Sequence, residues 1–266
     1  MKTNKIPPDM KKGTVFNSNK SGKFYVVNYI DGNNVEVEFF DTGYKFVARS
    51  QAIRKGNIKD PTARVIHGVA CFGVGDFAAS KNGKTSIAYN KWNNMLIRCY
   101  DDDYQSSKPT YKGCYVCDEW LNFQNFAKWF YDNYPKDGHQ YCLDKDLTVI
   151  GNKVYSPDTC MFVSNQVNCF VTDSAAARGQ YMIGVSMPKR GSRFKSYCHN
   201  PFTGSRGYIG YSETEKGAHM MWRERKSHFA NELSKIQTDR KVRDGLLNYK
   251  NALANFEIYK DGFNYE

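Results

Sequence analysis

The spacing of hydrophobic residues changes along the 266-residue chain, and this change constrains the fold more than any other feature. Residues 23–50 carry three short runs rich in β-branched and aromatic residues, and Asp-Gly-Asn-Asn at 31–34 is typical of a hairpin turn. From residue 87 to 134 the spacing becomes three and four, which is typical of amphipathic helices. Strand patterning returns at 180–212, and a further helical pattern follows it. This order predicts an α+β fold.

Two helices are expected between residues 87 and 134. The first begins at Ile87, and the second begins after Asp118, which is a suitable N-cap. The second helix should end at Pro135, because proline cannot continue a helix. The inward residues of the first helix are predicted to be Tyr89, Trp92, Leu96, Cys99 and Tyr100. Those of the second are predicted to be Phe123, Phe126, Ala127, Phe130 and Tyr134.

Residues 180–258 predict a three-stranded sheet backed by one helix. In the strand 193–198, Arg193, Lys195 and Tyr197 lie on one face, and the residues between them lie on the other. We expect Phe194 to pack on a helix at about 213–236, which leaves a basic strand face open. The inner face of this helix is predicted to be Ala218, Met221, Trp222, Phe229, Leu233 and Ile236. A last helix is expected at about 239–258.

Charge is unevenly distributed along the chain. The formal net charge is +11, and residues 178–250 hold 15 lysines and arginines against 6 acidic residues. Residues 100–160 hold 6 basic residues against 10 acidic ones. A basic block beside an acidic one favours a polyanion-binding surface next to a cation site. A solvated basic surface is the alternative.

The sequence shows no feature of a secreted or membrane protein. Residues 1–13 lack the apolar run of a signal peptide, and no stretch approaches the roughly 18–20 apolar residues of a membrane helix. We therefore expect a cytoplasmic location, no membrane partner and reduced thiols for the eight cysteines. Cys114 and Cys117 form the one close pair, and zinc would need further ligands. Candidates are Cys142, Cys160 and His139, but buried apolar cysteines are the favoured interpretation.

One stretch carries most of the chemical information. Residues 143–168, LDKDLTVIGNKVYSPDTCMFVSNQVN, join an acidic pair, a Gly-Asn turn and a final Asn168. With WNNMLIRCYDDDYQ and YKGCYVCDEWLNFQNFAKW before it, this stretch resembles phage-encoded HNH (His-Me finger) endonucleases. Residues 179–222 are similar to the Apetala-type DNA-binding domain of plant ethylene-response factors. The resemblance spans about residues 87–235.

The strand pattern of the first 60 residues and the resemblance together predict three domains, and the resemblance implies a metal site. The domains would be a small β-barrel-like module at 1–60, an HNH-like ββα-metal domain with preceding helices at 61–177, and an Apetala-type domain with a C-terminal helix at 178–266. Asp144 and Asn168 would bind Mg²⁺ or Mn²⁺, which would polarise the scissile phosphate; zinc is not expected.

Lys145 occupies the position of the catalytic histidine in this family. Making a lysine amine half neutral at pH 7 costs about 4–5 kcal/mol, so lysine is a poor general base. His139 is a candidate to substitute for the missing histidine, although a surface histidine is the favoured interpretation, and Lys145 could instead bind a phosphate as a point charge. Thr159 stands where the family has a structural asparagine.

The open strand face is the predicted DNA-binding site. A sheet laid in the major groove presents alternate side chains to base edges, and arginines pair with guanine. Arg223, Arg225 and Lys226, on the following helix, are expected to be solvated or close to phosphate. The predicted DNA-binding residues are Lys189, Arg190, Arg193, Lys195, Tyr197 and Arg206, with Tyr208 as a further backbone contact.

Three functions stay open at this point. The first is a sequence-preferring DNA endonuclease of the homing type, which hydrolyses phosphodiester bonds with a divalent metal. The second is a DNA-binding regulator or interference factor on a degenerate nuclease scaffold. The third is a phage structural or interaction protein. Lys145 separates the first two, and the basic block at 178–250 disfavours the third. The target site and the oligomeric state are not specified by the sequence.

Overall fold

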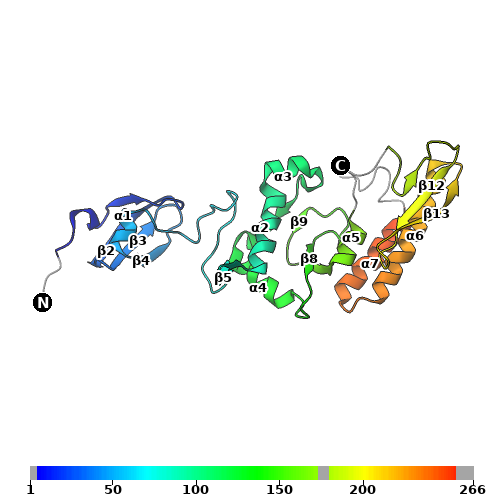
Figure 1. The fold of residues 1–266 in the computed structure, drawn as a ribbon. Coiled ribbons are helices and arrows are strands. Elements are labelled where there is room, and N and C mark those ends of the chain that lie inside the picture. The colour runs from blue at the N-terminus through cyan, green and yellow to red at the C-terminus, as the bar shows by residue number, and fades with distance from the viewer. Residues whose placement is uncertain (1–4, 173–179, 256–266) are drawn as a thin grey trace. The chain divides into compact units, whose positions relative to one another are not determined.

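The computed structural model describes residues 5–172 and 180–255 (Figure 1). It contains helices and several small sheets, in agreement with the predicted α+β class. The chain divides into two compact units. The first unit is Met1–Asp102 with Cys117–Phe130, and the second is Asp103–Val116 with Tyr131–Glu266.

The first unit begins with a four-stranded antiparallel sheet, ordered β1-β2-β3-β4. Strands β2, β3 and β4 match the three predicted runs, whereas β1 and the short helix α1 were not predicted. The Asp31 carboxylate accepts hydrogen bonds from the amides of Asn33 and Asn34, at 2.7 and 3.1 Å, and thereby fixes the predicted hairpin turn. The elements are η1 (Pro8–Met10), β1 (Val15–Asn17), β2 (Lys23–Asp31), β3 (Asn34–Phe39), β4 (Lys45–Ala48) and α1 (Ser50–Arg54).

One face of this sheet forms a core of its own. Alternate residues of β2 and β3 are buried, as a period of two requires. The residues of η1 and α1 close over the same side. The buried cluster is Met10, Phe24, Val26, Val35, Val37, Phe39, Ala48, Ile53 and Ile58.

The rest of the first unit is mainly helical. The predicted helix at Ile87 is confirmed, and the hydroxyl of Ser86 caps it by accepting from the Tyr89 amide at 3.1 Å. Asp118 opens a short 3-10 helix rather than the second α-helix, which begins only at Phe123. The elements are β5 (Ser80–Lys81), β6 (Lys84–Thr85), α2 (Ile87–Tyr100), η3 (Asp118–Leu121) and α4 (Phe123–Asn133).

The second unit begins with short elements around a hairpin. Strand β8 pairs antiparallel with β10, and helix α5 follows β10 directly, capped by the Ser164 hydroxyl. Strand β7 pairs parallel with β9, which lies in the connection between β8 and β10. The elements are α3 (Asp102–Ser107), η2 (Pro109–Tyr111), β7 (Tyr115–Val116), β8 (Tyr141–Asp144), β9 (Val154–Tyr155), β10 (Met161–Ser164) and α5 (Asn165–Val171).

The second unit ends with a three-stranded antiparallel sheet, ordered β11-β12-β13, that packs on α6. One hydrophobic core joins α6 and α7 to β10 and α5. It includes Met161 and Val167 as well as Trp222 and Leu246, so it crosses the predicted boundary at residue 177. The elements are β11 (Val185–Ser186), β12 (Phe194–His199), β13 (Arg206–Ser212), α6 (Glu215–Lys235) and α7 (Arg240–Ala254).

Two predictions about α6 are wrong. Ile236 was expected inside, but it follows the end of the helix and is 58% exposed. Arg223 and Lys226 were expected in solvent, but both are buried. The Arg223 guanidinium donates to the carbonyl of Leu253 at 2.7 Å, and the Lys226 ammonium donates to that of Phe170 at 2.5 Å. These carbonyls lie in the last turns of α7 and α5, where backbone acceptors lack helical partners.

The contacts around α6 also show how closely the sheet approaches it. Gly184, just before β11, has no room for a Cβ atom against Trp222. Phe194 is half-buried, and its ring lies edge-on to Tyr181 with the centroids 5.7 Å apart.

Arg225 is exposed on α6, as predicted. No helix within the described ranges is long and apolar enough to cross a membrane.

Candidate functional site

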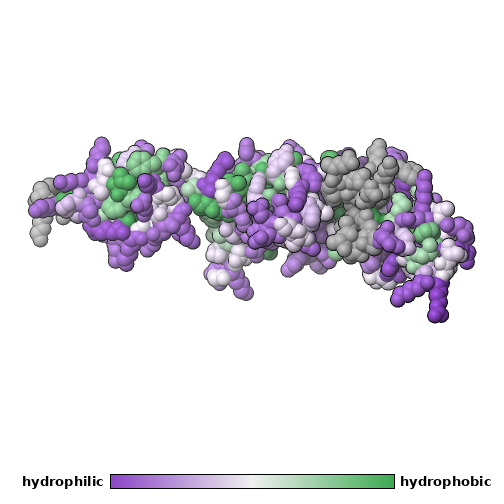
Figure 2. All heavy atoms as spheres, turned by 90° about the horizontal axis from the view of Figure 1, so that it is seen from above, coloured by the Kyte–Doolittle hydropathy of each residue, from purple (hydrophilic) through white to green (hydrophobic). Residues whose placement is uncertain are grey.

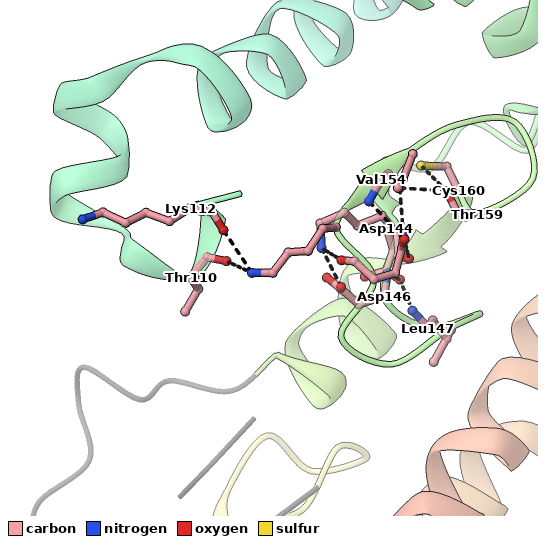
Figure 3. A network of polar contacts seen from close by, with 11 residues as sticks. Thr110, Lys112, Asp144, Asp146, Leu147, Val154, Thr159 and Cys160 are labelled. Carbon is pink, nitrogen blue, oxygen red and sulfur yellow. Dashed lines mark hydrogen bonds and ion pairs between the residues drawn. The ribbon is translucent and has the colours of Figure 1, made fainter. Parts of the chain in front are cut away.

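The turn after β8 places Asp144 at the end of the strand (Figure 3). Its Oδ1 accepts hydrogen bonds from the amides of Asp146 and Leu147, at 3.1 and 2.7 Å. The side chain is buried, and burial together with the charge of Asp146 raises the pKa of Asp144 to about 6. At neutral pH the group is therefore mostly a carboxylate in a setting that disfavours its charge, so a bound cation would stabilise it.

Both hydrogen-bond acceptors of the Lys145 ammonium lie in the turn after β8. Its ammonium lies 2.6 Å from Asp146 Oδ1, donates to the carbonyl of Asn152 at 2.5 Å and lies 5.7 Å from the centre of the Tyr155 ring. The side-chain amide of Asn152 donates back to the Lys145 carbonyl at 2.8 Å. The Lys145 side chain is only 5% exposed. These contacts favour a structural role, in which the ammonium holds the two ends of the turn together.

Two further residues fix the connection between β8 and β10. Thr159 Oγ1 donates to the carbonyl of Val154 at 2.8 Å and lies 2.9 Å from Ser156 Oγ. The Lys153 ammonium donates to the carbonyls of Thr110 and Lys112, at 3.1 and 3.2 Å. Thr159 thus ties the loop at the position where the resemblance implies a structural asparagine.

The other predicted catalytic and metal-binding residues lie in separate elements. Asn168 is half-buried on α5, and His139 is exposed in the turn before β8. The His139 amide donates to Asp137 Oδ1 at 3.0 Å. Among the described residues, no hydrogen bond joins Asp144 to Asn168 or to His139. That Asp144 and Asn168 face one another across a cation stays a prediction.

The cysteine pair has the character of buried thiols. Cys114 is buried and Cys117 is half-buried, and burial raises the pKa of both thiols. Within residues 5–172 and 180–255, no three His, Cys, Asp or Glu side chains converge on one point. The predicted site consists of Asp144 and Asn168 and so does not contain three residues of these types. This absence therefore does not bear on the prediction of Mg²⁺ or Mn²⁺.

The three-stranded sheet has one face on α6 and one open face. Ser196 and Cys198 of β12 are buried, and Gly210 of β13 lies against the end of the Met221 side chain of α6. Lys195 and Tyr197 alternate with the buried residues of β12 and therefore lie on the open face.

A row of three tyrosines crosses the open face. The rings of Tyr197 and Tyr208 are 5.6 Å apart, and those of Tyr208 and Tyr211 are 5.5 Å apart. Ser196 pairs with Gly210 but Tyr197 pairs with Tyr208, so Ile209 is an extra residue in β13. Sequence reasoning missed Tyr211, because strict alternation places residues three apart on opposite faces. The bulge brings both tyrosines to the same face.

Two of these rings, those of Tyr197 and Tyr211, each have at least one cationic side chain over them. The Arg206 guanidinium is 4.4 Å from the centre of the Tyr197 ring, and that of Arg193 is 4.9 Å from the centre of the Tyr211 ring. The Lys195 ammonium is 5.6 Å from the same Tyr211 ring. Arg193 and Arg206 are exposed and Lys195 is half-buried. Stacking on a ring orients a guanidinium and leaves its edge free to donate hydrogen bonds.

The last two predicted DNA-binding residues lie at the border of this face. Lys189 and Arg190 are exposed in the connection between β11 and β12. They add positive charge next to the tyrosine row but make no described contact with its rings.

Comparison of the chain with protein-family models, with curated proteins and with solved structures gives no match.

Proposed function

We propose that this chain is a double-stranded DNA-binding protein whose contact surface is the open face of β11–β13. The observation that carries the proposal is the set of cations over the tyrosine row, of which Arg193 and Arg206 are exposed. The net charge of +11 and the basic block at 178–250 point in the same direction. Localisation in the cytoplasm fits this function.

The geometry suits the major groove, which admits a β-ribbon as well as a helix. Arg206 can pair with guanine O6 and N7 through its free edge. Arg193 can do so through its terminal nitrogens, since its Nε lies 3.9 Å from Glu213 Oε1. Lys195 is a point charge, better suited to a phosphate. The tyrosine hydroxyls can reach sugar or phosphate oxygens beside the arginines.

The test is binding of the full chain to random and selected duplexes over a salt series. The double variant Arg193→Ala, Arg206→Ala should bind at least about 30-fold more weakly, since each specific arginine contributes about 1–3 kcal/mol and every 1.4 kcal/mol is tenfold in affinity. The matched control is Arg225→Ala, because Arg225 is also exposed and lies 6.0 Å from the Phe229 ring, but on α6. Equal affinities of parent and double variant would overturn the proposal.

Metal-dependent hydrolysis of DNA at the turn after β8 is the second candidate. It is favoured by the order β8, turn, β10, α5, with Asp144 at the end of the first strand and Asn168 on the helix. The contacts of Lys145 with Asp146 and Asn152 place a structural cation where this chemistry needs a base. We therefore expect cleavage to be slow and dependent on Mg²⁺ or Mn²⁺.

A plasmid-nicking assay with each metal tests the second candidate. Asn168→Ala should remove cleavage, whereas Asn165→Ala, an exposed position on the same helix, should retain it. Cleavage that survives Asn168→Ala would place the activity elsewhere. If no DNA is cut by the parent, the chain acts by binding alone.

A further inference from the structure

The sheet of the first unit also has an open face, opposite the core formed by Phe24, Val37 and Phe39. Pairing across the four strands brings one residue of each into a single row. Phe40, directly after β3, is 55% exposed next to this row. Figure 2 shows hydrophobic residues on the surface of this β module bordered by hydrophilic ones. The row is Val15, Tyr25, Glu38 and Lys45.

A hollow of about 360 Å³ opens in this face. It is lined by Gly13, Tyr25, Glu38, Phe39 and Phe40. The rings of Tyr25 and Phe40 are 4.9 Å apart and inclined by 47°. Two aromatic rings and one carboxylate therefore border the same open depression.

The carboxylate in the hollow is held in its charged form. A hydrogen bond with the Tyr25 hydroxyl and the neighbouring Lys45 ammonium lower the pKa of Glu38. Lys45 lies 3.3 Å from Glu38 Oε2, but its side chain is 66% exposed. Such surface ion pairs contribute little to stability, so another cation can join or displace Lys45.

We propose that this hollow receives an arginine side chain from a basic segment of a partner protein. The guanidinium stacks on Phe40 or Tyr25 and donates to the Glu38 carboxylate. Aromatic faces attract cations, and guanidinium pairs with a carboxylate through parallel hydrogen bonds. The carboxylate repels phosphate, so this face and the tyrosine row take ligands of opposite charge.

The test is a titration of the full chain with the capped peptide Gly-Gly-Arg-Gly-Gly, followed through the aromatic NMR signals of Tyr25 and Phe40. The comparison peptide carries citrulline, which is neutral, in place of arginine. We expect saturable shifts with the arginine peptide and at least about fivefold weaker binding of the citrulline peptide.

Three variants sharpen the result. Glu38→Gln and Phe40→Ala should each weaken binding about three- to tenfold, as expected for an exposed cation–π or ion-pair contact. Lys45→Met removes the competing cation and should strengthen binding about twofold. Glu36→Gln is the matched control, because Glu36 also belongs to β3, two residues from Glu38, but does not line the hollow.

Several outcomes would overturn the proposal. These are equal binding of both peptides, unchanged affinity in Glu38→Gln, or shifts of the two rings with an oligonucleotide in place of the peptide. The proposal is independent of DNA binding, since the variants lie in a different sheet.

Discussion

Charged side chains are used in opposite ways in the turn after β8 and on the open face of β11–β13. In the turn, Asp144 and Lys145 are buried and bonded to groups of the same turn. On the open face, Arg193 and Arg206 are exposed and lie over tyrosine rings. The Lys145 ammonium stabilises a loop and the Asp144 oxygen accepts from two of its amides, while Arg193 and Arg206 can bind a ligand without breaking any buried contact.

The difference bears on which of the two regions carries the function. A buried charge that bonds within the protein must lose those bonds before it acts on a substrate. An exposed guanidinium on a ring loses little when it donates to DNA, because its orientation is already set. Binding through the sheet is therefore better supported than hydrolysis at the turn.

The largest effect is expected for Lys145→Met, which keeps the aliphatic packing and removes the ammonium. The contacts with Asp146 and the Asn152 carbonyl are lost, at a cost of about 2–4 kcal/mol in the free energy of unfolding. Chemical denaturation measures this change. DNA affinity at low denaturant should stay within about twofold of the parent.

Lys189→Met is the control for this variant, because Lys189 is exposed. It should leave stability within about 0.5 kcal/mol. If Lys145→Met is as stable as the parent but no longer binds or cuts DNA, Lys145 acts on the ligand and the structural interpretation is wrong.

Asp144→Asn, in contrast to Lys145→Met, is expected to increase the free energy of unfolding above pH 6. The pKa of Asp144 is raised from 3.8 to about 6 by burial, so the folded state binds the proton more tightly than the unfolded chain. The protonated Asp144 carboxyl therefore contributes its full stabilisation of the fold below about pH 4. This stabilisation is lost as pH rises through about 6. The variant keeps the oxygen that accepts from Asp146 and Leu147. It should therefore match the parent at pH 4 and be about 1–3 kcal/mol more stable at pH 8.

Adding Mg²⁺ or Mn²⁺ at pH 8 extends this measurement. A cation bound to the carboxylate should raise the melting temperature of the parent and leave that of Asp144→Asn unchanged. Equal shifts in both proteins would show that the metal does not bind at Asp144.

Arg206→Ala tests the exposed side of the comparison. It should weaken DNA binding by about 1–3 kcal/mol and relax sequence preference at one base pair, since Arg206 presents its free edge from the Tyr197 ring. Selection of random duplexes by parent and variant measures both effects. Tyr197→Phe retains the ring and should retain sequence preference. A uniform loss across all sequences would instead assign Arg206 to a phosphate.

The sequence predicted the elements better than it predicted the environment of their charges. The helix at Ile87, the strands at 23–48 and the basic face of β12 follow from period and capping, which are local. The burial of Arg223 and Lys226 depends on α7 and α5, which cover the side of α6 that a single amphipathic helix would leave in water. Helical period alone does not specify a second covering layer.

The candidate site shows the same limit. Arg193, Lys195 and Tyr197 alternate in sequence, so their common face was predictable. Tyr211 joins them only because of the extra residue in β13, and neither composition nor spacing marks that bulge. The position of Lys145 predicted a weak nuclease, but its bond to the Asn152 carbonyl depends on the path of a loop.

The smallest effect is expected for Lys195→Ala. Lys195 is half-buried beside Arg193 on the Tyr211 ring, and an ammonium makes no bidentate contact with a base. It should therefore contact a phosphate, so its loss should weaken all duplexes alike and lower the salt slope by about one unit. The measurement is affinity for one strong and one weak duplex at several salt concentrations. Lys235→Ala, an exposed lysine at the end of α6, is the control and should leave the slope unchanged. A change for the strong duplex alone would assign base recognition to Lys195, and no change at all would place the DNA away from the Tyr211 end of the sheet.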